Sequence, residues 1–191
     1  MAADYVHEYN GMTREAMLAK MAKGWMSSET PCGRGSEKAM TTGVRQLIPL
    51  LIKEHGFTTI ADAGAGDLNW MRFVDIPEDV TYQGYDLHPR HPDVIEFDIT
   101  SQVLVPCDLI ICRHVLNHLS VKLANDAITN FMASRARYLL MTFCDNQSAY
   151  WTKHGLQLWD PVNAWKDATK WTIGLWDLTE GDIRRVNPEL R

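Results

Sequence analysis

The pattern of apolar positions predicts two helices near the start of the chain. The first covers residues 13–23, where Thr13 can cap the N-terminus and Gly24 ends the helix. Its apolar side chains recur at helical spacing at Met17, Leu18 and Met21. The glycine-, serine- and proline-containing residues 24–35 then predict an ordered loop.

The second helix is expected to begin at a cap formed by Ser36. Pro49 is expected to kink this helix or to split off its last turn, and Gly56 to end it. The predicted inward face consists of Met40, Val44, Leu47, Ile48 and Leu51.

From residue 58 onward, short apolar runs alternate with helical or turn segments, which is typical of a parallel α/β sheet. A short helix is expected over residues 69–73. A longer one should follow a cap at Ser120, with its inward side chains at Val121, Ala124, Ile128, Phe131 and Met132. The expected strands are residues 58–63, 81–86, 94–97, 108–112 and 138–143.

The last 41 residues differ from the rest because they hold five of the seven tryptophans among turn-forming residues. Antiparallel edge strands are expected there, one of them over residues 171–175. Trp159 and Trp165 either stack on a substrate ring or belong to the core. We therefore predict a Rossmann-like, mostly parallel sheet with helices on both faces and antiparallel strands near the C-terminus.

Length and composition indicate one globular domain, since 191 residues with 46% hydrophobic and 23% charged positions suffice for a full core. Within the domain 1–191 we distinguish a helix and covering loop (1–35), the Rossmann-like core (36–145) and a tryptophan-rich end (146–191). No secretion signal or membrane span is apparent, so a cytoplasmic location is expected. The net charge of −5 argues against extended nucleic-acid binding.

The four cysteines carry no metal or disulfide signature, because no CxxC pair occurs. Cys107, Cys112 and Cys144 lie in or beside apolar runs, which favours reduced, buried thiols. No metal is expected.

The most informative stretch is the turn after the first expected strand. Gly64 and Gly66 lie one residue apart, so the backbone can approach a ligand there. Asn69 stands where a dinucleotide fingerprint has its third glycine, and Asp62 precedes the first glycine by two positions. A carboxylate at Asp62 suits a cationic group, whereas no pyrophosphate cradle is required.

Two further aspartates follow the next two expected strands. Asp86 is positioned to accept hydrogen bonds from ribose hydroxyls, and Asp98 with Ile99 to contact an exocyclic amine and a purine face. Asp62, Asp86 and Asp98 would then share one rim of the sheet. The alternative interpretation, that they only cap turns, applies most to Asp98.

This order of motifs resembles class I S-adenosylmethionine-dependent methyltransferases. It is most similar to a subgroup of small bacterial and phage-type enzymes with the loop G-W-x-x-x-E-S-x-S-G-x-G-S, the helix T-x-x-x-R-x-x-L-P and the turn D-x-x-x-G-D-x-N-W-M. The match runs from about residue 24 to about residue 144. The matching residues are Gly24, Trp25, Glu29, Gly33, Gly35, Ser36, Thr41, Arg45, Pro49, Asp62, Gly66, Asp67, Asn69, Trp70 and Met71.

The resemblance implies S-adenosyl-L-methionine as cofactor, with Arg34 and Ser36 folding over its methionine end and Arg113 lining the same pocket. The alternative for Arg34 is a solvated loop charge. Departures are the sequence Ala63-Gly64-Ala65, where the subgroup often has A-P-C, and His114, where it often has Asp. The complete expected cofactor site is Arg34, Ser36, Asp62, Gly64, Gly66, Asn69, Trp70, Asp86, Leu87, Asp98, Ile99 and Arg113.

His114 and Arg113 are the candidate catalytic residues, because they follow the fourth expected strand where a transferred methyl group should point. Imidazole titrates near neutral pH and can act as a base for a hydroxyl acceptor. Alternatively, His114 only bonds a backbone carbonyl, and His118 packs at the entry to the helix. The His114–His118 pair lacks the glutamate of a zinc motif.

The sequence thus predicts an enzyme that transfers a methyl group to oxygen or nitrogen of a small molecule, glycan or nucleotide. Two alternatives remain: a catalytically inactive nucleoside-binding module or partner subunit, and an NAD-dependent oxidoreductase.

Overall fold

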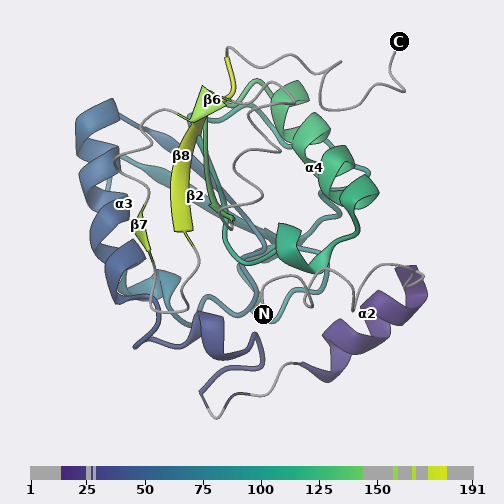
Figure 1. Ribbon diagram of the computed structural model, residues 1–191. Coiled ribbons are helices and arrows are strands. Elements are labelled where there is room, and N and C mark those ends of the chain that lie inside the picture. Colours follow the sequence, from purple (N-terminus) through teal and green to yellow (C-terminus); the bar gives the residue numbers. More distant parts are fainter. Residues whose placement is uncertain are drawn as a thin grey trace.

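The centre of the fold is a mixed eight-stranded sheet in the order β3-β2-β1-β4-β5-β8-β6, with β7 also paired to β8 (Figure 1). The structure is a computed structural model that describes residues 14–24, 27, 29–143, 157–158, 165–166 and 172–179. The first five strands run parallel to one another, while β8 runs antiparallel to β5. The strands are β1 (Thr59–Ala63), β2 (Thr81–Asp86), β3 (Val94–Glu96), β4 (Leu109–Cys112), β5 (Tyr138–Phe143), β6 (Gln157–Leu158), β7 (Trp165–Lys166) and β8 (Thr172–Asp177).

The predicted Rossmann-like class is therefore confirmed, including the antiparallel strands near the C-terminus. The sheet reverses its order between β1 and β4, and this reversal is where open α/β sheets bind ligands beyond the carboxyl ends of their strands.

Helices α3 (Thr42–His55) and α4 (Val121–Ala133) lie on opposite faces of the sheet, and α2 (Arg14–Lys23) lies near the end of the sheet that the N-terminal loop approaches (Figure 1). Alternate residues of each strand point to opposite faces. Ile60 and Leu140 accordingly pack with α3, whereas Ala61 and Leu139 pack with α4. Two hydrophobic cores result, one on each side.

The apolar face predicted for the second helix holds at Val44, Leu47, Ile48 and Leu51, all of which are buried. Its predicted start was wrong. Ser36 ends a 3-10 helix, η1 (Arg34–Ser36), and α3 begins only at Thr42 after Thr41, so Met40 precedes the helix.

The helix continues through Pro49 to His55 without interruption, and Gly56 ends it in the left-handed conformation at φ 67°. The first of the two outcomes predicted for Pro49, a kink, is compatible with this continuous helix; a separate last turn is not.

On the other face, Ser120 caps α4 as predicted, because its hydroxyl accepts a hydrogen bond from the amide of Leu123. Val121, expected inside, is half exposed at the first position of α4, while Ala124, Ile128 and Phe131 are buried. The predicted terminal strand corresponds to β8, and Trp176 there is fully buried. Trp159 lies outside the described residues.

Candidate cofactor site

Three aspartates lie at the carboxyl ends of three neighbouring parallel strands. Asp62 belongs to β1, Asp86 ends β2, and Asp98 follows β3 by two residues. Since β1 pairs with β2 and β2 with β3, all in parallel, the three residues share one rim of the sheet. The structure thus brings together the residues that the sequence analysis grouped.

Asp62 is buried, with only 3% of its surface exposed. The hydroxyl of Tyr82 donates a 2.8 Å hydrogen bond to its Oδ2. Burial raises the pKa of Asp62 to about 7; the charge of Asp86 adds to this effect, whereas Tyr82 and the Arg113 guanidinium oppose it. A positively charged ligand group at this carboxylate would offset the cost of burying it.

Asp86 accepts two backbone hydrogen bonds, from Gly66 at 2.9 Å and from His88 at 2.8 Å. Burial raises its pKa even though both amides oppose the shift. Its carboxylate therefore ties the glycine turn to the end of β2.

Asp98 caps a turn, because its Oδ1 accepts from the backbone amide of Thr100 at 2.9 Å and from the Thr100 hydroxyl at 2.6 Å. The turn interpretation thus describes the observed contacts of this residue. Ile99 is buried in the core on the α4 side, and its carbonyl accepts a 2.9 Å bond from Nδ2 of Asn130.

The two glycines of the turn allow close contacts with protein side chains. A Cβ on Gly64, whose φ is 107°, would lie 2.2 Å from Cγ2 of Val115, and one on Gly66 would lie 2.5 Å from Sγ of Cys32. The backbone amides of Gly64 and Ala65 both donate to the carbonyl of Tyr85. The close approach predicted for a ligand is thus made here by Val115 and Cys32.

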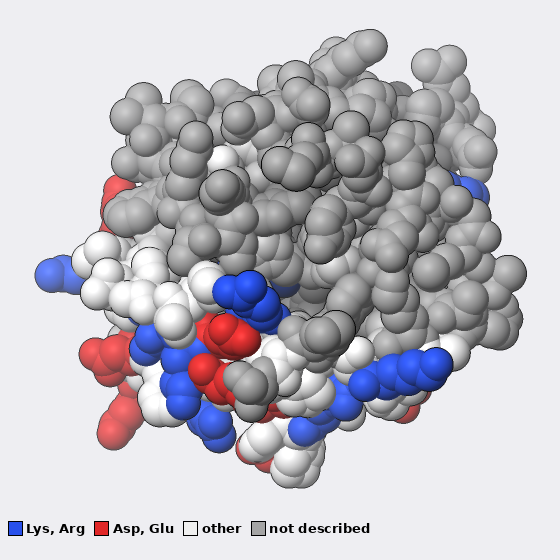
Figure 2. Space-filling view, turned by 60° about the horizontal axis from the view of Figure 1, so that its bottom comes forward, with Lys and Arg blue, Asp and Glu red and all other residues white. Residues whose placement is uncertain are grey.

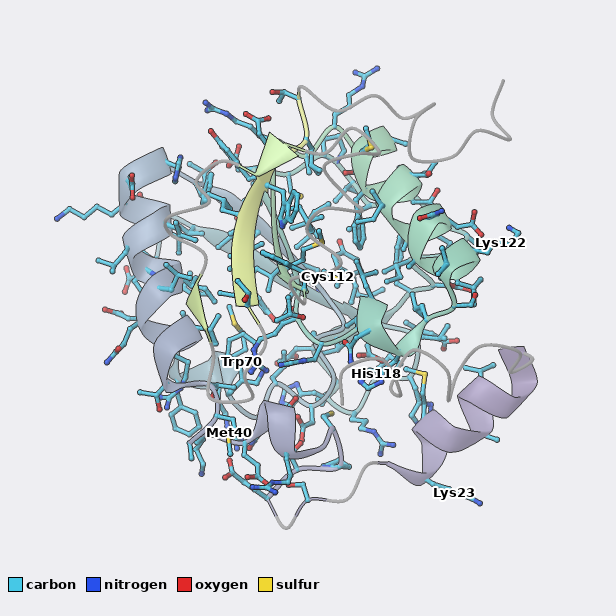
Figure 3. The ribbon with its side chains drawn as sticks, viewed as in Figure 1. Lys23, Met40, Trp70, Cys112, His118 and Lys122 are labelled. Carbon is cyan, nitrogen blue, oxygen red and sulfur yellow. The ribbon has the colours of Figure 1, made fainter. Side chains whose placement is uncertain are left out.

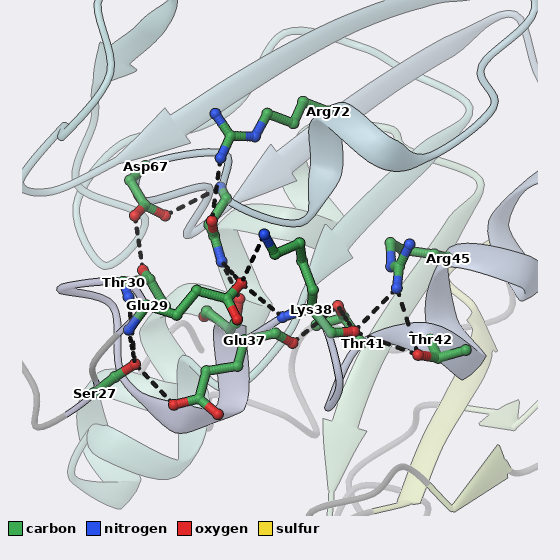
Figure 4. Close-up of polar contacts among 12 residues, drawn as sticks. Ser27, Glu29, Thr30, Glu37, Lys38, Thr41, Thr42, Arg45, Asp67 and Arg72 are labelled. Atoms are coloured by element: carbon green, nitrogen blue, oxygen red, sulfur yellow. Dashed lines mark hydrogen bonds and ion pairs between the residues drawn. The ribbon is translucent and has the colours of Figure 1, made fainter.

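A polar network fastens the N-terminal loop, residues 29–38, over this turn (Figure 4). The Thr30 hydroxyl donates a 2.7 Å bond to Asp67, which directly follows Gly66. Nδ2 of Asn69 donates to Oε1 of Glu29 at 2.7 Å and to the carbonyl of Ser36 at 3.0 Å. Residues 29–38 therefore lie on the glycine turn, and Asn69 holds them there.

Arg113, buried after β4, joins the same loop to the sheet. Its Nη1 donates a 2.6 Å bond to the carbonyl of Gly35, and its guanidinium carbon lies 5.7 Å from the centre of the Trp70 ring. Figure 3 shows Trp70 at the end of the sheet nearest the N-terminal loop. Arg113 and Trp70 therefore stand beside the loop, and Trp70 belongs to the core against which Tyr82 also packs.

His114 adopts a left-handed backbone conformation with φ 54°, which is rare for a residue with a side chain. Its amide donates a 2.8 Å bond to the hydroxyl of Thr142, and its ring faces Gly35, where an added Cβ would lie 3.3 Å from Cδ2. The imidazole thus lies at the edge of the loop beside Arg113.

The remaining predicted residues have plainer surroundings. Arg34 is exposed, Ser36 and Leu87 are partly buried, and Nε2 of His118 lies 3.3 Å from Nδ2 of Asn117. Among the described residues, no group of three or more histidine, cysteine or acidic side chains is arranged to hold a metal ion.

Sequence reasoning missed Tyr82, Thr30 and Cys32. Tyr82 and Asp62 are neighbours only because of the β1–β2 register, in which Ile60 lies opposite Tyr82 and Asp62 opposite Gly84. Thr30 and Asp67 are 37 residues apart in the chain, so no local pattern links them.

This sheet order and site rim define the fold of class I S-adenosylmethionine-dependent methyltransferases. Among solved structures, the chain is similar to the methyltransferase domain of the bacterial protein CtHen1, with a TM-score of 0.57 and 9% identity over 72% of this chain and 99% of that one. It is also similar to magnesium protoporphyrin IX methyltransferase from Synechocystis PCC 6803 solved with bound SAM, at a TM-score of 0.51 and 13% identity over 93% and 97% of the two chains.

A third similar structure is the N-methyltransferase NodS from Bradyrhizobium japonicum WM9, with a TM-score of 0.53 and 14% identity over 74% of this chain and 98% of that one. At the level of sequence, no family model and no curated protein matches. The likeness therefore lies in the fold.

Proposed function

We propose that this protein is a class I methyltransferase that uses S-adenosyl-L-methionine, acts in the cytoplasm and methylates oxygen or nitrogen of a small molecule, glycan or nucleotide. The observation that carries the proposal is the buried carboxylate of Asp62, on the same rim as Asp86 and Asp98. We also propose that residues 1–191 form one domain, that the residues predicted above bind the cofactor, and that the chain belongs to the subgroup its motifs resemble.

The donor set fits the cofactor. Burial disfavours the charged forms of Asp62 and Asp86, and their mutual repulsion adds to this for Asp62. A ligand carrying an ammonium group and ribose hydroxyls would give both carboxylates partners. When bound, S-adenosylmethionine would supply a methyl group activated by a sulfonium. The chain's own residues would orient the acceptor and exclude water.

In this proposal, the loop of residues 29–38 and Arg113 form the wall around the methionine end. His114 orients the acceptor or removes its proton, because its ring stands beside Gly35 where the loop meets β4. The net charge of −5 suits a small acceptor better than a long phosphate backbone. Where Figure 2 shows described residues, acidic and basic side chains lie interspersed, and they form no field of one sign there.

The described geometry disfavours the oxidoreductase alternative. A dinucleotide site places its pyrophosphate at the start of a full helix after the glycine turn. Here the turn leads into η2 (Met71–Phe73), a 3-10 helix of three residues, and Asn69 replaces the third glycine.

Among the helices of the described ranges, none has the length and hydropathy of a membrane span.

Calorimetric titration of the whole protein with S-adenosylmethionine, S-adenosylhomocysteine and NAD tests the proposal. We expect both adenosyl ligands to bind and NAD not to bind. Asp62→Ala should abolish this binding, whereas Asp75→Ala, a change at an exposed aspartate, should leave it unchanged. Binding of NAD alone would refute the proposal.

Turnover separates an enzyme from an inactive binding module. Protein and labelled S-adenosylmethionine are incubated with cell extract, and labelled products are identified by mass. We expect His114→Ala to retain cofactor binding and to lose turnover. Cofactor binding without any labelled product would favour the binding module, and undiminished turnover in His114→Ala would remove the catalytic role of that residue.

A further inference from the structure

In the described part of the chain, the hydroxyl of Tyr82 donates a hydrogen bond to the buried carboxyl group of Asp62. Tyr82 lies on β2 opposite Ile60, two positions from the pair formed by Asp62 and Gly84. The two side chains are thus diagonal neighbours on the α3 face. Gly84 carries no side chain of its own, and an added Cβ there would lie 2.9 Å from Cβ of Ala65 and 3.2 Å from Cγ2 of Val94.

We propose that Tyr82 is a positioning residue for the cofactor: its hydroxyl holds Oδ2 of Asp62, which favours the charged carboxylate and directs Oδ1 to the ammonium group of S-adenosylmethionine. This inference rests on the proposed function. Tyr82 acts through Asp62 and does not itself touch the reacting atoms.

The charged groups around Asp62 show how much the hydrogen bond from Tyr82 matters for its pKa. The charge of Asp86, at the end of β2, raises the pKa of Asp62. The charge of Asp62 in turn raises the pKa of the Cys112 thiol in β4. Arg113, after β4, is the cation that favours the charged form, and its Nη1 is engaged with Gly35. The hydrogen bond from Tyr82 therefore provides the strongest opposition to the cost of burying Asp62.

Among the described residues, the hydroxyl of Tyr82 makes its hydrogen bond to Asp62 alone. Its side chain is partly buried and packs against the core on the α3 side. Burial, followed by the charge of Asp62, raises its own pKa far above the ordinary value, so the phenol remains a proton donor at every pH of interest.

The test compares two ligands that differ only at the amino-acid end. S-adenosylhomocysteine carries the ammonium group, whereas methylthioadenosine has the same nucleoside and thioether without it. We expect Tyr82→Phe to weaken S-adenosylhomocysteine binding about tenfold at neutral pH, as loss of a hydrogen bond to a charged group implies. Methylthioadenosine should bind the variant and the native protein equally.

The pH dependence gives a second readout that a merely structural role would not move. Binding of S-adenosylhomocysteine to the native protein should strengthen as pH rises through the pKa of Asp62, about 7. Because the hydrogen bond favours the charged form, Tyr82→Phe should shift this midpoint to higher pH. Titrations between about pH 5.5 and about pH 7.5 stay below the pKa of an α-amino group, about 7.7–8.0, so the ligand's ammonium group keeps most of its charge.

Tyr85→Phe is the matched control, because it removes a hydroxyl from the same strand on the opposite face of the sheet. It should change neither affinity nor midpoint. Equal weakening of both ligands by Tyr82→Phe, an unmoved midpoint, or failure of the variant to fold would each overturn the proposal, since the hydroxyl would then serve the core. If the native protein bound neither ligand, the proposed function itself would fail.

Discussion

The hydroxyl of Thr30 and the carboxylate of Asp67 are joined by a 2.7 Å hydrogen bond between the N-terminal loop and the glycine turn. The same hydroxyl accepts a 3.0 Å bond from the amide of Cys32, so one buried side chain serves both segments. The N-terminal loop and the glycine turn are therefore joined by hydrogen bonds. The position of the loop over the site depends on these contacts between residues far apart in the chain.

Thr30→Val should loosen this unit, because valine keeps the shape of threonine but leaves Asp67 and the Cys32 amide without their partner. We expect a loss of about 1–3 kcal/mol in the free energy of unfolding and faster proteolysis within residues 29–38. Chemical denaturation and limited proteolysis measure the two effects. Thr30→Ser, which retains the hydroxyl, should lose much less, and equal losses in both variants would contradict the role of the bond.

Asp62 should make the ligand-free protein less stable as pH rises. Its pKa is about 7 in the folded protein and about 3.9 in an unfolded chain. The folded state thus binds the proton more tightly. The stability that this group contributes is complete below about pH 3.9 and is lost as pH rises through about 7. Asp62→Asn should therefore be more stable than the native protein at pH 8, by on the order of 1 kcal/mol or more, and no more stable at pH 4. Thermal melting across this range is the measurement.

For Asp108 we expect the stability of the folded protein to depend on pH in the opposite direction. Burial acts to raise its pKa, but hydrogen bonds from the backbone and hydroxyl groups of Thr58 and Thr59 lower it below the usual value. Its contribution is present above the pKa of the unfolded chain and is lost as pH falls through the folded pKa. Asp108→Asn should be less stable than the native protein at neutral pH, and the difference should shrink on acidification. The same sign for both aspartates would contradict the two assignments.

The sequence predicted the sheet well because buried parallel strands leave a strong local mark. The run Leu109–Cys112 is apolar throughout and fully buried, as a strand covered on both faces must be. Because successive strands of such a sheet run parallel, the shared rim of Asp62 and Asp86 followed from their positions at strand ends. The partners of these carboxylates did not follow, because Tyr82 meets Asp62 only through the register of two strands.

Tertiary contacts also explain the errors at helix starts. Ser36 has the residue type of a cap, but its carbonyl accepts a bond from Asn69, 33 residues away, and the chain turns again before α3 begins. Val121 follows the apolar periodicity of α4, yet the first turn of that helix projects beyond the core and leaves its side chain exposed. The apolar periodicity of a helix indicates which of its faces is buried. It does not indicate where along the helix the packing against the sheet ends.

His114 holds a left-handed backbone conformation that costs a side-chain-bearing residue about 1–2 kcal/mol. His114→Gly should therefore be more stable than His114→Ala by about 1 kcal/mol, since both lose the ring and only glycine relieves the backbone. Denaturation of the two variants measures the difference. Arg135, with φ 62° at an exposed position, offers the same comparison away from the site. Equal stability of the glycine and alanine variants at position 114 would show that the backbone stores no strain there.

Cys32 should react slowly with alkylating reagents while the loop is closed. Burial, followed by the charge of Asp67, raises the pKa of its thiol to about 11, so only about one molecule in ten thousand carries a thiolate at pH 7. Thr30→Val, which loosens the loop, should speed alkylation of Cys32 by iodoacetamide, as followed by peptide mass spectrometry. Cys107 serves as an internal control, because burial raises its pKa to about 11 as well and it lies before β4, away from the loop. Its rate should be the same in both proteins. Alkylation of Cys32 in the native protein as fast as in the urea-unfolded chain would contradict the close contact between this thiol and Gly66.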